Sequence, residues 1–215
     1  MLEAMRDTAH DAQHVYRVLD GALLIAEEMP GVNRDVLIAA CLLHDIGREA
    51  QYRDERLCHA REGAKMAYDY LVEIGWTGQD AGRVRDCIRT HRYRGDDQPA
   101  SDEAKVLFDA DKLDAAGALA VARTVMYCAL VGEPIYSVGE DGRPLDGSGD
   151  EPPSFMNEYC VKLSRIYDQF YTAKGRELGL ERKPILTAFY QALRREAAQL
   201  SGDGEAARLE KVSRG

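Results

Sequence analysis

The repetition of apolar residues at helical spacing is the feature that most restricts the fold of this chain. Between about Thr8 and Met29 these residues recur at steps of three and four, which places them on one face of a helix. Pro30 and Gly31 then end that helix, and Asn33 is a good N-cap for the next one, RDVLIAACLLHDIG. Alternating apolar and polar runs of useful strand length do not occur. The pattern predicts an all-α protein.

The same reasoning places helices along the rest of the chain. They are expected over residues 58–75, 78–93 (with Thr77 as N-cap), 101–132 with a break near Gly117, 154–178 and 184–200. Residues 132–153 are dense in Gly, Pro and Asp and are predicted to form one long polar loop. Residues 201–215 are predicted to be a polar tail that frays. For a chain of 215 residues we expect one domain over residues 1–200.

Charge and cysteine usage exclude several classes of function. The net charge is −9. We expect no nucleic-acid polymer as a partner, because binding one needs a broad basic surface. No apolar run is long enough to span a bilayer, and the N-terminal residues lack the apolar core of a signal peptide. The five cysteines form no CxxC pair and are typical of a reducing compartment. We therefore expect a cytoplasmic protein that does not bind membranes.

Two histidines and an aspartate occur where their burial would be costly. His14 stands four residues before Val18 on the apolar face of its helix, and His44 and Asp45 close the apolar run CLLHDIG. Adjacent helical residues diverge by about 100°, which suits two ligands that approach one metal ion from neighbouring directions. A single buried histidine is ordinarily a core residue with a hydrogen-bond partner. The combination points to a metal site.

The segment DADKLDA, residues 109–115, adds carboxylates to this set. Asp111 and Asp114 lie on roughly one side of a helix, whereas Asp109 faces away from Asp111. Two imidazoles and two carboxylates make a mixed nitrogen and oxygen site that suits Mn, Fe, Co, Ni, Zn or Mg with open water positions. Asp114 is expected to support a ligand or to pack the helix.

These motifs resemble the HD superfamily of metal-dependent phosphohydrolases. HVYRV (14–18), LLHDIG (42–47) and DADKLDA occur in the order of the superfamily pattern H…HD…D. HAREGA (59–64), THRYRG (90–95) and the later KL segment extend the likeness to a subfamily of small single-domain bacterial hydrolases, over about residues 8–198. The resemblance implies an HD-type helical bundle. It also implies His14, His44, Asp45 and Asp111 as metal ligands; His10, in the earlier pair His10–Asp11, falls outside the pattern.

The resemblance implies hydrolysis of a phosphate ester or anhydride of a small phosphorylated molecule, most plausibly a nucleotide. The cofactor is expected to be one or two divalent ions, among Mn, Mg, Co, Ni and Fe, and a homodimer is compatible with the family. Two alternatives stay open. One is an HD-fold di-iron oxygenase, which the further histidines permit, and the other is a nucleotide-binding sensor without catalytic activity.

Further residues are expected to act in catalysis and substrate binding, His59 and His91 because of the same likeness and the basic residues because of their neighbours in the sequence. His59 and His91 either hold a second ion with Asp45 as the bridge, or act as acid/base or phosphate-contacting groups around a single ion. Asp45 is expected to orient or deprotonate a water. Lys112, next to Asp111, is expected to act in catalysis and to contact the phosphate. The remaining candidate phosphate contacts are Arg17, Arg92 and Arg94, and the alternative for Arg17 is that it braces a carboxylate of the site.

Overall fold

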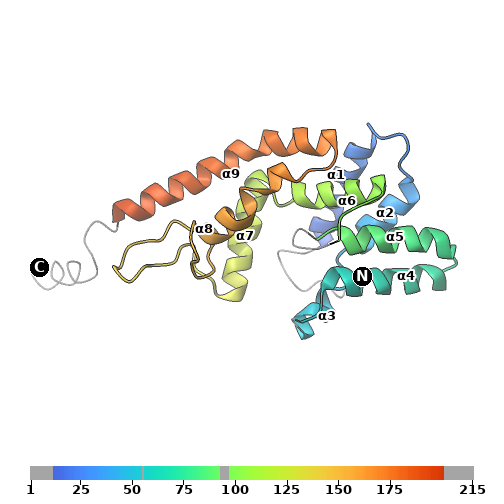
Figure 1. Ribbon diagram of the computed structural model, residues 1–215, viewed down its shortest axis with the longest axis horizontal. Coiled ribbons are helices and arrows are strands. Elements are labelled where there is room, and N and C mark those ends of the chain that lie inside the picture. The colour runs from blue at the N-terminus through green and yellow to red at the C-terminus, as the bar shows by residue number, and fades with distance from the viewer. Residues whose placement is uncertain (1–11, 55, 93–96, 201–215) are drawn as a thin grey trace, which may run out of the picture. The chain divides into compact units, whose positions relative to one another are not determined.

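The computed structural model describes residues 12–54, 56–92 and 97–200, and these residues are helical apart from turns and loops. The all-α prediction is confirmed: within the described ranges the only β-type pairing is an isolated bridge between Val138 and Pro144. The main helices in chain order are α1 (Ala12–Ala26), α2 (Arg34–Leu43), α3 (Arg48–Arg53), α4 (His59–Glu73), α5 (Gly78–Thr90), α6 (Asp102–Leu113), α7 (Gly117–Val131), α8 (Phe155–Glu158) and α9 (Ala173–Leu200) (Figure 1).

The chain divides into two compact units. The first contains the residues up to Ala115 together with Gln169–Gly179, and the second contains Ala116–Asp168 and the residues from Leu180 onward. The chain therefore returns to the first unit at the start of α9 and leaves it again within that helix. We predicted a single domain over residues 1–200. Two compact units do not by themselves define two domains, so that prediction stays open.

The first unit is a helical bundle in which α1, α2, α5 and α6 pack against one another and α4 packs on α5. Val18, Leu37, Ile88 and Leu107, one from each of the four packed helices, are fully buried in its core. The predicted N-caps are confirmed. Asn33 and Thr77 each accept a hydrogen bond from the backbone three residues later, at 3.1 Å. Ser101, at the expected start of the next helix, does the same at 3.1 Å. These caps fix the helix starts and hence which face of each helix is buried.

A tight turn after α2 brings the HD pair against α4. α2 ends at Leu43, and residues 44–47 form the turn that leads into α3. The backbone of Gly47 approaches α4 so closely that a Cβ atom there would lie 2.3 Å from the His59 carbonyl oxygen and 2.5 Å from the Gly63 nitrogen. Only glycine allows this approach, so Gly47 and Gly63 together set the distance between Asp45 and the start of α4.

The return of the chain to the first unit is fixed by a buried carboxylate. Asp109 on α6 is fully buried and accepts hydrogen bonds from the Tyr171 nitrogen (2.9 Å), the Thr172 nitrogen (2.7 Å) and the Thr172 hydroxyl (2.6 Å). The Thr172 Oγ1 in turn accepts from the Gly175 nitrogen at 2.9 Å, which satisfies a free N–H at the start of α9. Asp109 thus bonds to the segment before α9 while Asp111 faces His14, so the two carboxylates point in different directions, as predicted.

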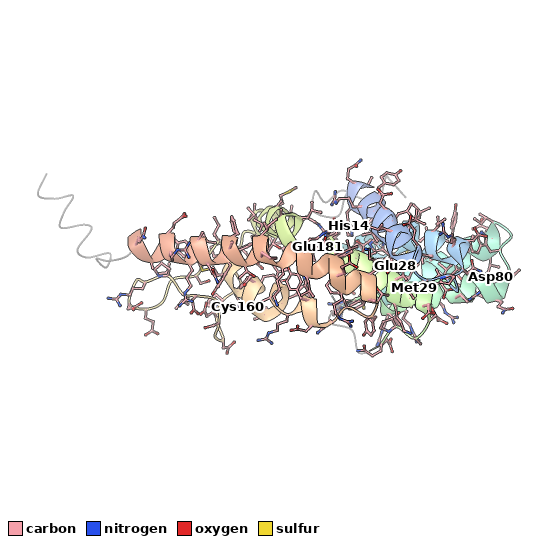
Figure 2. The ribbon with its side chains drawn as sticks, turned by 90° about the horizontal axis from the view of Figure 1, so that it is seen from above. His14, Glu28, Met29, Asp80, Cys160 and Glu181 are labelled. Atoms are coloured by element: carbon pink, nitrogen blue, oxygen red, sulfur yellow. The ribbon has the colours of Figure 1, made fainter. Side chains whose placement is uncertain are left out.

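The second unit holds α7, the long polar loop, α8 and most of α9. The loop at 132–153 is confirmed as non-helical. It is attached to α9 at Asp146, whose carbonyl accepts from the Tyr190 hydroxyl at 2.6 Å and from the Cys160 thiol at 3.6 Å. The Tyr190 ring stacks on Tyr159 with centroids 3.9 Å apart. Figure 2 labels Cys160 near this attachment.

Two predicted helices differ from the structure. The helix expected over residues 154–178 is broken into α8, a π-helical turn (Tyr159–Leu163), a short 3-10 turn (Ile166–Asp168) and the irregular residues before α9. The helix expected from Pro184 instead begins at Ala173 and continues through that proline. A proline inside a helix removes one backbone donor and its ring crowds the carbonyl one turn earlier, at a cost of roughly 3 kcal/mol, so packing must offset this cost. Leu186, two residues later, is fully buried and helps to hold the helix there.

No single helix among the described residues is both long and apolar enough to cross a membrane. The consecutive helices α6 and α7 pass the test only as a bent pair, by length and composition.

Candidate functional site

Four histidines of the first unit direct the same ring nitrogen inward. In each ring Nδ1 bonds to an acceptor behind it: Asp114 for His14 (2.7 Å), the Cys41 carbonyl for His44 (2.8 Å), the Gln51 amide oxygen for His59 (2.8 Å) and the Ile88 carbonyl for His91 (2.6 Å). All four rings are buried. Because these acceptors take a proton from Nδ1, the neutral ring presents a lone pair at Nε2.

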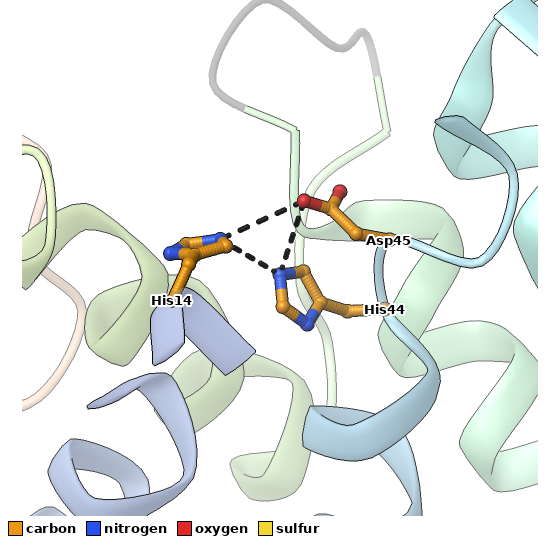
Figure 3. Close-up of side chains that lie close together, drawn as sticks. All are labelled: His14, His44 and Asp45. Carbon is orange, nitrogen blue, oxygen red and sulfur yellow. Dashed lines mark hydrogen bonds and ion pairs between the residues drawn. The ribbon is translucent and has the colours of Figure 1, made fainter. Parts of the chain in front are cut away.

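The four Nε2 atoms converge on the two oxygens of Asp45. The Nε2 atoms of His14 and His44 lie 3.6 and 3.5 Å from Asp45 Oδ2. Figure 3 marks both contacts with dashed lines. The Nε2 atoms of His91 and His59 lie 3.7 and 3.9 Å from Oδ1, on the other side of the same carboxylate. Asp45 is therefore shared by two clusters of ligand atoms, each of which could hold a metal ion.

A divalent cation fits the chemistry of these clusters. Asp45 Oδ2 and His91 Nε2 are buried and have no hydrogen-bond partner among the described residues. The Nε2 atoms of His14 and His44 lie 3.2 Å apart with no proton available between two neutral rings. Buried lone pairs that face one another are costly unless a cation lies between them. Donors bound about 2.1 Å from one ion lie roughly 3 to 3.5 Å apart, close to the spacing found here.

Asp111 adds a second carboxylate on the His14 side. Its Oδ1 lies 3.6 Å from His14 Nε2, and its Oδ2 accepts from the Lys112 ammonium at 2.6 Å. Burial acts to raise the pKa of the Asp111 carboxyl, but Lys112 and the histidines outweigh it and hold that pKa well below its ordinary value. Asp111 is therefore ionised and has one oxygen directed at the first cluster.

Lys112 connects the two clusters. Its buried ammonium donates to Asp111 and also to the His91 carbonyl at 3.0 Å, and it lies over the Phe108 ring, 4.8 Å from the centroid. The lysine thus ties a carboxylate of the first cluster to the backbone of a histidine of the second. In the structure the Lys112 ammonium bonds to Asp111 and to the His91 carbonyl. Its contact with a phosphate stays a prediction.

A chain of charged groups stands behind His14. Asp114 accepts from His14 Nδ1, and Arg17 donates to both Asp114 oxygens, at 2.6 and 2.9 Å. Asp114 is the only carboxylate among the four Nδ1 acceptors, so the His14 ring is the most strongly polarised of the four. Of the two roles expected for Asp114, the structure places it behind a candidate ligand. Arg17, a predicted phosphate contact, braces that carboxylate.

Charge states follow from burial and from the neighbouring cations. Burial lowers the pKa of His44 to about 4. Burial, Arg48 and His91 lower the pKa of His59 to about 2. Burial acts to raise the pKa of Asp45, yet Arg48 and His44 hold it well below its ordinary value. At neutral pH the Asp45 carboxylate is therefore ionised and the His44 and His59 rings are neutral, which is the protonation state that metal ligation needs.

The other predicted phosphate contacts lie on the second-cluster side or outside the described residues. The Arg92 guanidinium donates to the Cys58 sulfur at 3.5 Å, next to His59. Arg94 and the histidine of the earlier HD dipeptide, His10, fall outside the described residues.

Two residues of the site were not predicted from the sequence. Arg48 donates from Nε to Asp45 Oδ1 at 2.9 Å, and Gln51 orients His59. Arg48 had a usable signal, because it follows the HDIG motif and stands three residues after Asp45, the spacing of a helical ion pair. Gln51 had none, because its contact depends on how α3 packs against α4.

The fold and the site together define a class: an all-α metal-dependent hydrolase built around histidines and aspartates. The comparisons with known proteins agree. The family model described as HD domain matches residues 11–116. A relative from Bacillus subtilis (strain 168), the uncharacterized protein YpgQ, is 30% identical over 193 residues, which cover 88% of this chain and 85% of the relative. The chain belongs to the HD-domain family and is a metal-dependent phosphohydrolase of the small bacterial type.

Solved structures of relatives extend over most of the chain. The crystal structure of B. subtilis YpgQ in complex with ADP is 30% identical, covers 87% of this chain and 90% of its own, and superposes with a TM-score of 0.66. An HD superfamily hydrolase from an uncultured Thermotogales bacterium is 28% identical, with coverage of 90% and 87% and a TM-score of 0.60. An HD-superfamily hydrolase from Bacillus thuringiensis is 27% identical, with coverage of 87% and 86% and a TM-score of 0.62.

Proposed function

We propose that this phosphohydrolase cleaves a phosphate ester or anhydride bond of a nucleotide with the help of one or two divalent ions. The observation that carries the proposal is the convergence of the Nε2 atoms of four histidines on the two oxygens of the buried Asp45 carboxylate. A nucleotide is supported by the relative whose structure was solved with ADP. Nitrogen and oxygen donors of this kind suit Mn, Mg, Co, Ni or Fe.

The first ion position would be formed by His14, His44, Asp45 and Asp111. A divalent ion there, when bound, supplies a Lewis acid for the phosphoryl group and a water of lowered pKa. Asp45 has a pKa too low for an efficient base, so its part is to hold and orient that water. Asp114 and Arg17 keep the His14 ring in the orientation and tautomer that present Nε2.

His59 and His91 are better suited to hold a second ion than to donate a proton. Both rings use Nδ1 as a donor to a fixed acceptor, which leaves an inward lone pair at Nε2. A general acid needs a proton at the atom that faces the substrate, and here that atom is an acceptor. Both lone pairs face the same oxygen of Asp45. These features support Asp45 as a bridge between two ions.

Positive side chains close to the clusters would receive the phosphate charge in a protein of net charge −9. Arg48 and Arg92 lie on the His59 side, where both act to lower the pKa of that ring, and Arg17 and Lys112 lie on the His14 side. We propose Arg17, Arg92, Arg94 and Lys112 as substrate contacts, with Arg48 added to them. A homodimer also remains a prediction.

A hydrolysis screen tests the proposal. Nucleoside mono-, di- and triphosphates and cyclic dinucleotides would be incubated with the protein and Mn, Mg, Co, Ni or Fe(II). Phosphorus NMR would follow released phosphate and pyrophosphate, and the new phosphomonoester that forms when a phosphodiester is opened. We expect one of these products with at least one nucleotide class and one metal. Oxygen-dependent turnover with two bound irons would instead favour a di-iron oxygenase. Nucleotide binding without release under any metal would favour a sensor.

A further inference from the structure

The two sides of Asp45 differ in what already occupies them. Asp45 Oδ2, which faces His14 and His44, has no hydrogen-bond partner among the described residues. Oδ1, which faces His59 and His91, accepts from Arg48 Nε at 2.9 Å. Asp45 is nearly completely buried, whereas the Arg48 side chain is 25% exposed and stands at the first position of α3. The guanidinium can therefore leave the oxygen without unfolding a helix.

A second ion and the Arg48 guanidinium would compete for the same oxygen. An ion between His59, His91 and Asp45 Oδ1 would lie within a few ångströms of a fixed positive charge, and repulsion at that distance is strong inside a protein. At the first position no hydrogen-bond donor among the described residues occupies the Asp45 oxygen. Asp111 adds a carboxylate oxygen there, and its cation partner Lys112 bonds to its other oxygen.

We propose that Arg48 is a gate for the second ion position. While its guanidinium is bonded to Asp45 Oδ1, the position between His59 and His91 binds a divalent ion weakly, and the ion is held only when Arg48 leaves that oxygen. The two positions therefore load in order, the His14–His44 position first. This inference rests on the proposed function in that it takes the ions of a phosphohydrolase as the ligands, but it concerns metal binding and needs no turnover.

Manganese binding to the metal-free protein tests the gate. The amount of free Mn²⁺ would be followed by electron paramagnetic resonance during titration of the wild type, Arg48→Gln and Arg48→Lys. We expect the wild type to bind one ion tightly and a second at least roughly tenfold more weakly. Arg48→Gln, which removes the charge and keeps a donor, should tighten the second ion by roughly tenfold and leave the first within about threefold. Arg48→Lys should resemble the wild type.

A matched arginine on the same helix is the control. Arg53 ends α3, is 76% exposed and pairs with Glu49, so Arg53→Ala should leave both affinities unchanged. Coupling between the two manganese ions in the resonance spectrum would report that the second ion lies beside the first, and it should appear at lower Mn²⁺ concentration in Arg48→Gln.

Two results would overturn the gate. One is two equally tight ions in the wild type. The other is an Arg48→Gln protein that is folded by circular dichroism and binds its second ion no more tightly than the wild type, which would mean that Arg48 only supports Asp45. Failure of the proposed function looks different: the wild type would bind manganese in this order and release neither phosphate nor pyrophosphate from any nucleotide.

Discussion

At the scale of single residues, the site is organised by what lies behind each histidine. His44 and His91 are oriented by carbonyls three residues earlier in their own helices, whereas His14 and His59 depend on the side chains of Asp114 and Gln51. A substitution of Asp114 or Gln51 can therefore change the orientation of His14 or His59, whereas no side-chain substitution removes the acceptor behind His44 or His91. It also separates the clusters, because only the first contains a ring that is backed by a carboxylate.

Asp114→Asn should weaken the first ion while the fold is retained. The amide keeps the shape but loses the charge that polarises His14 and pairs with Arg17, and loss of such a partner typically costs about 10- to 100-fold in metal affinity. Calorimetric titration of the metal-free protein with Mn²⁺ measures this affinity. Asp102→Asn, on the same helix but 53% exposed, is the control and should bind normally. Equal affinity in wild type and Asp114→Asn would show that the carboxylate does not support the ligand.

The metal-free protein should lose stability as the pH falls from about 6.5 towards 4. The unfolded chain protonates its histidines near their ordinary pKa of about 6.5, whereas burial lowers the pKa of folded His44 to about 4, so the unfolded state binds more protons in this window. The contribution of His44 is fully present above pH 6.5 and amounts to about 3 kcal/mol over the whole shift.

Urea unfolding at several pH values measures this loss. The carboxyls of Asp45 and Asp111, with lowered pKa values, contribute below the window, because their stabilisation is lost only as the pH falls below that of an ordinary carboxyl. His44→Gln should show a shallower fall between pH 6.5 and 4. A wild-type curve that is flat in this range would contradict the prediction.

At the scale of helices, the sequence predicted starts and buried faces better than interruptions. Asn33, Thr77 and Ser101 were identifiable because an N-cap is a local signal, and His14 was placed correctly by its spacing to Val18. The break after α8 was not identifiable. It accompanies the stacking of Tyr159 on a residue of α9, thirty-one positions later in the chain. Contacts at such separation leave no trace in a local pattern.

Gly47→Ala should disturb the site through the helices that carry it. The added Cβ would lie 2.3 Å from the His59 carbonyl oxygen, so α4 must move away from the HD turn. We expect a loss of more than about 2 kcal/mol of unfolding free energy and weaker binding of both ions. Gly82→Ala is the matched control. Nothing lies within 4 Å of its added Cβ, and a helical alanine there should be neutral or stabilise by roughly 0.5–1 kcal/mol.

Chemical denaturation with and without Mn²⁺ distinguishes these effects. If Gly47→Ala kept wild-type stability and metal affinity, the glycine contact would not set the position of α4.

At the scale of the whole molecule, the residues of the site come from six segments that meet in one compact unit. α1, the end of α2 with the turn after it, α3, α4, the end of α5 and α6 each contribute a side chain or a carbonyl. The family likeness identified the ligand candidates because they recur in a fixed order along the chain. Arg48 and Gln51 became visible only when the segments were assembled, because their partners are defined by packing.

Metal should therefore stabilise the whole of this unit. An ion that binds only the folded protein adds to the unfolding free energy in proportion to the logarithm of its concentration, about 2.7 kcal/mol at 100 times the dissociation constant. EDTA should lower the melting temperature of protein purified with metal, and added Mn²⁺ should raise it in a concentration-dependent way. Asp45→Asn should melt at the same temperature in both conditions. A wild type insensitive to chelator would contradict metal binding at this site.

The different supports of the four histidines have a consequence for how such a site can evolve. Two rings take their orientation from the main chain, so any sequence that keeps those helical turns keeps their direction. The other two take it from Asp114 and Gln51, which single base changes can replace without touching a ligand. We therefore expect metal affinity to be adjustable at Asp114 on the His14 side and at Gln51 on the His59 side without replacement of a ligand.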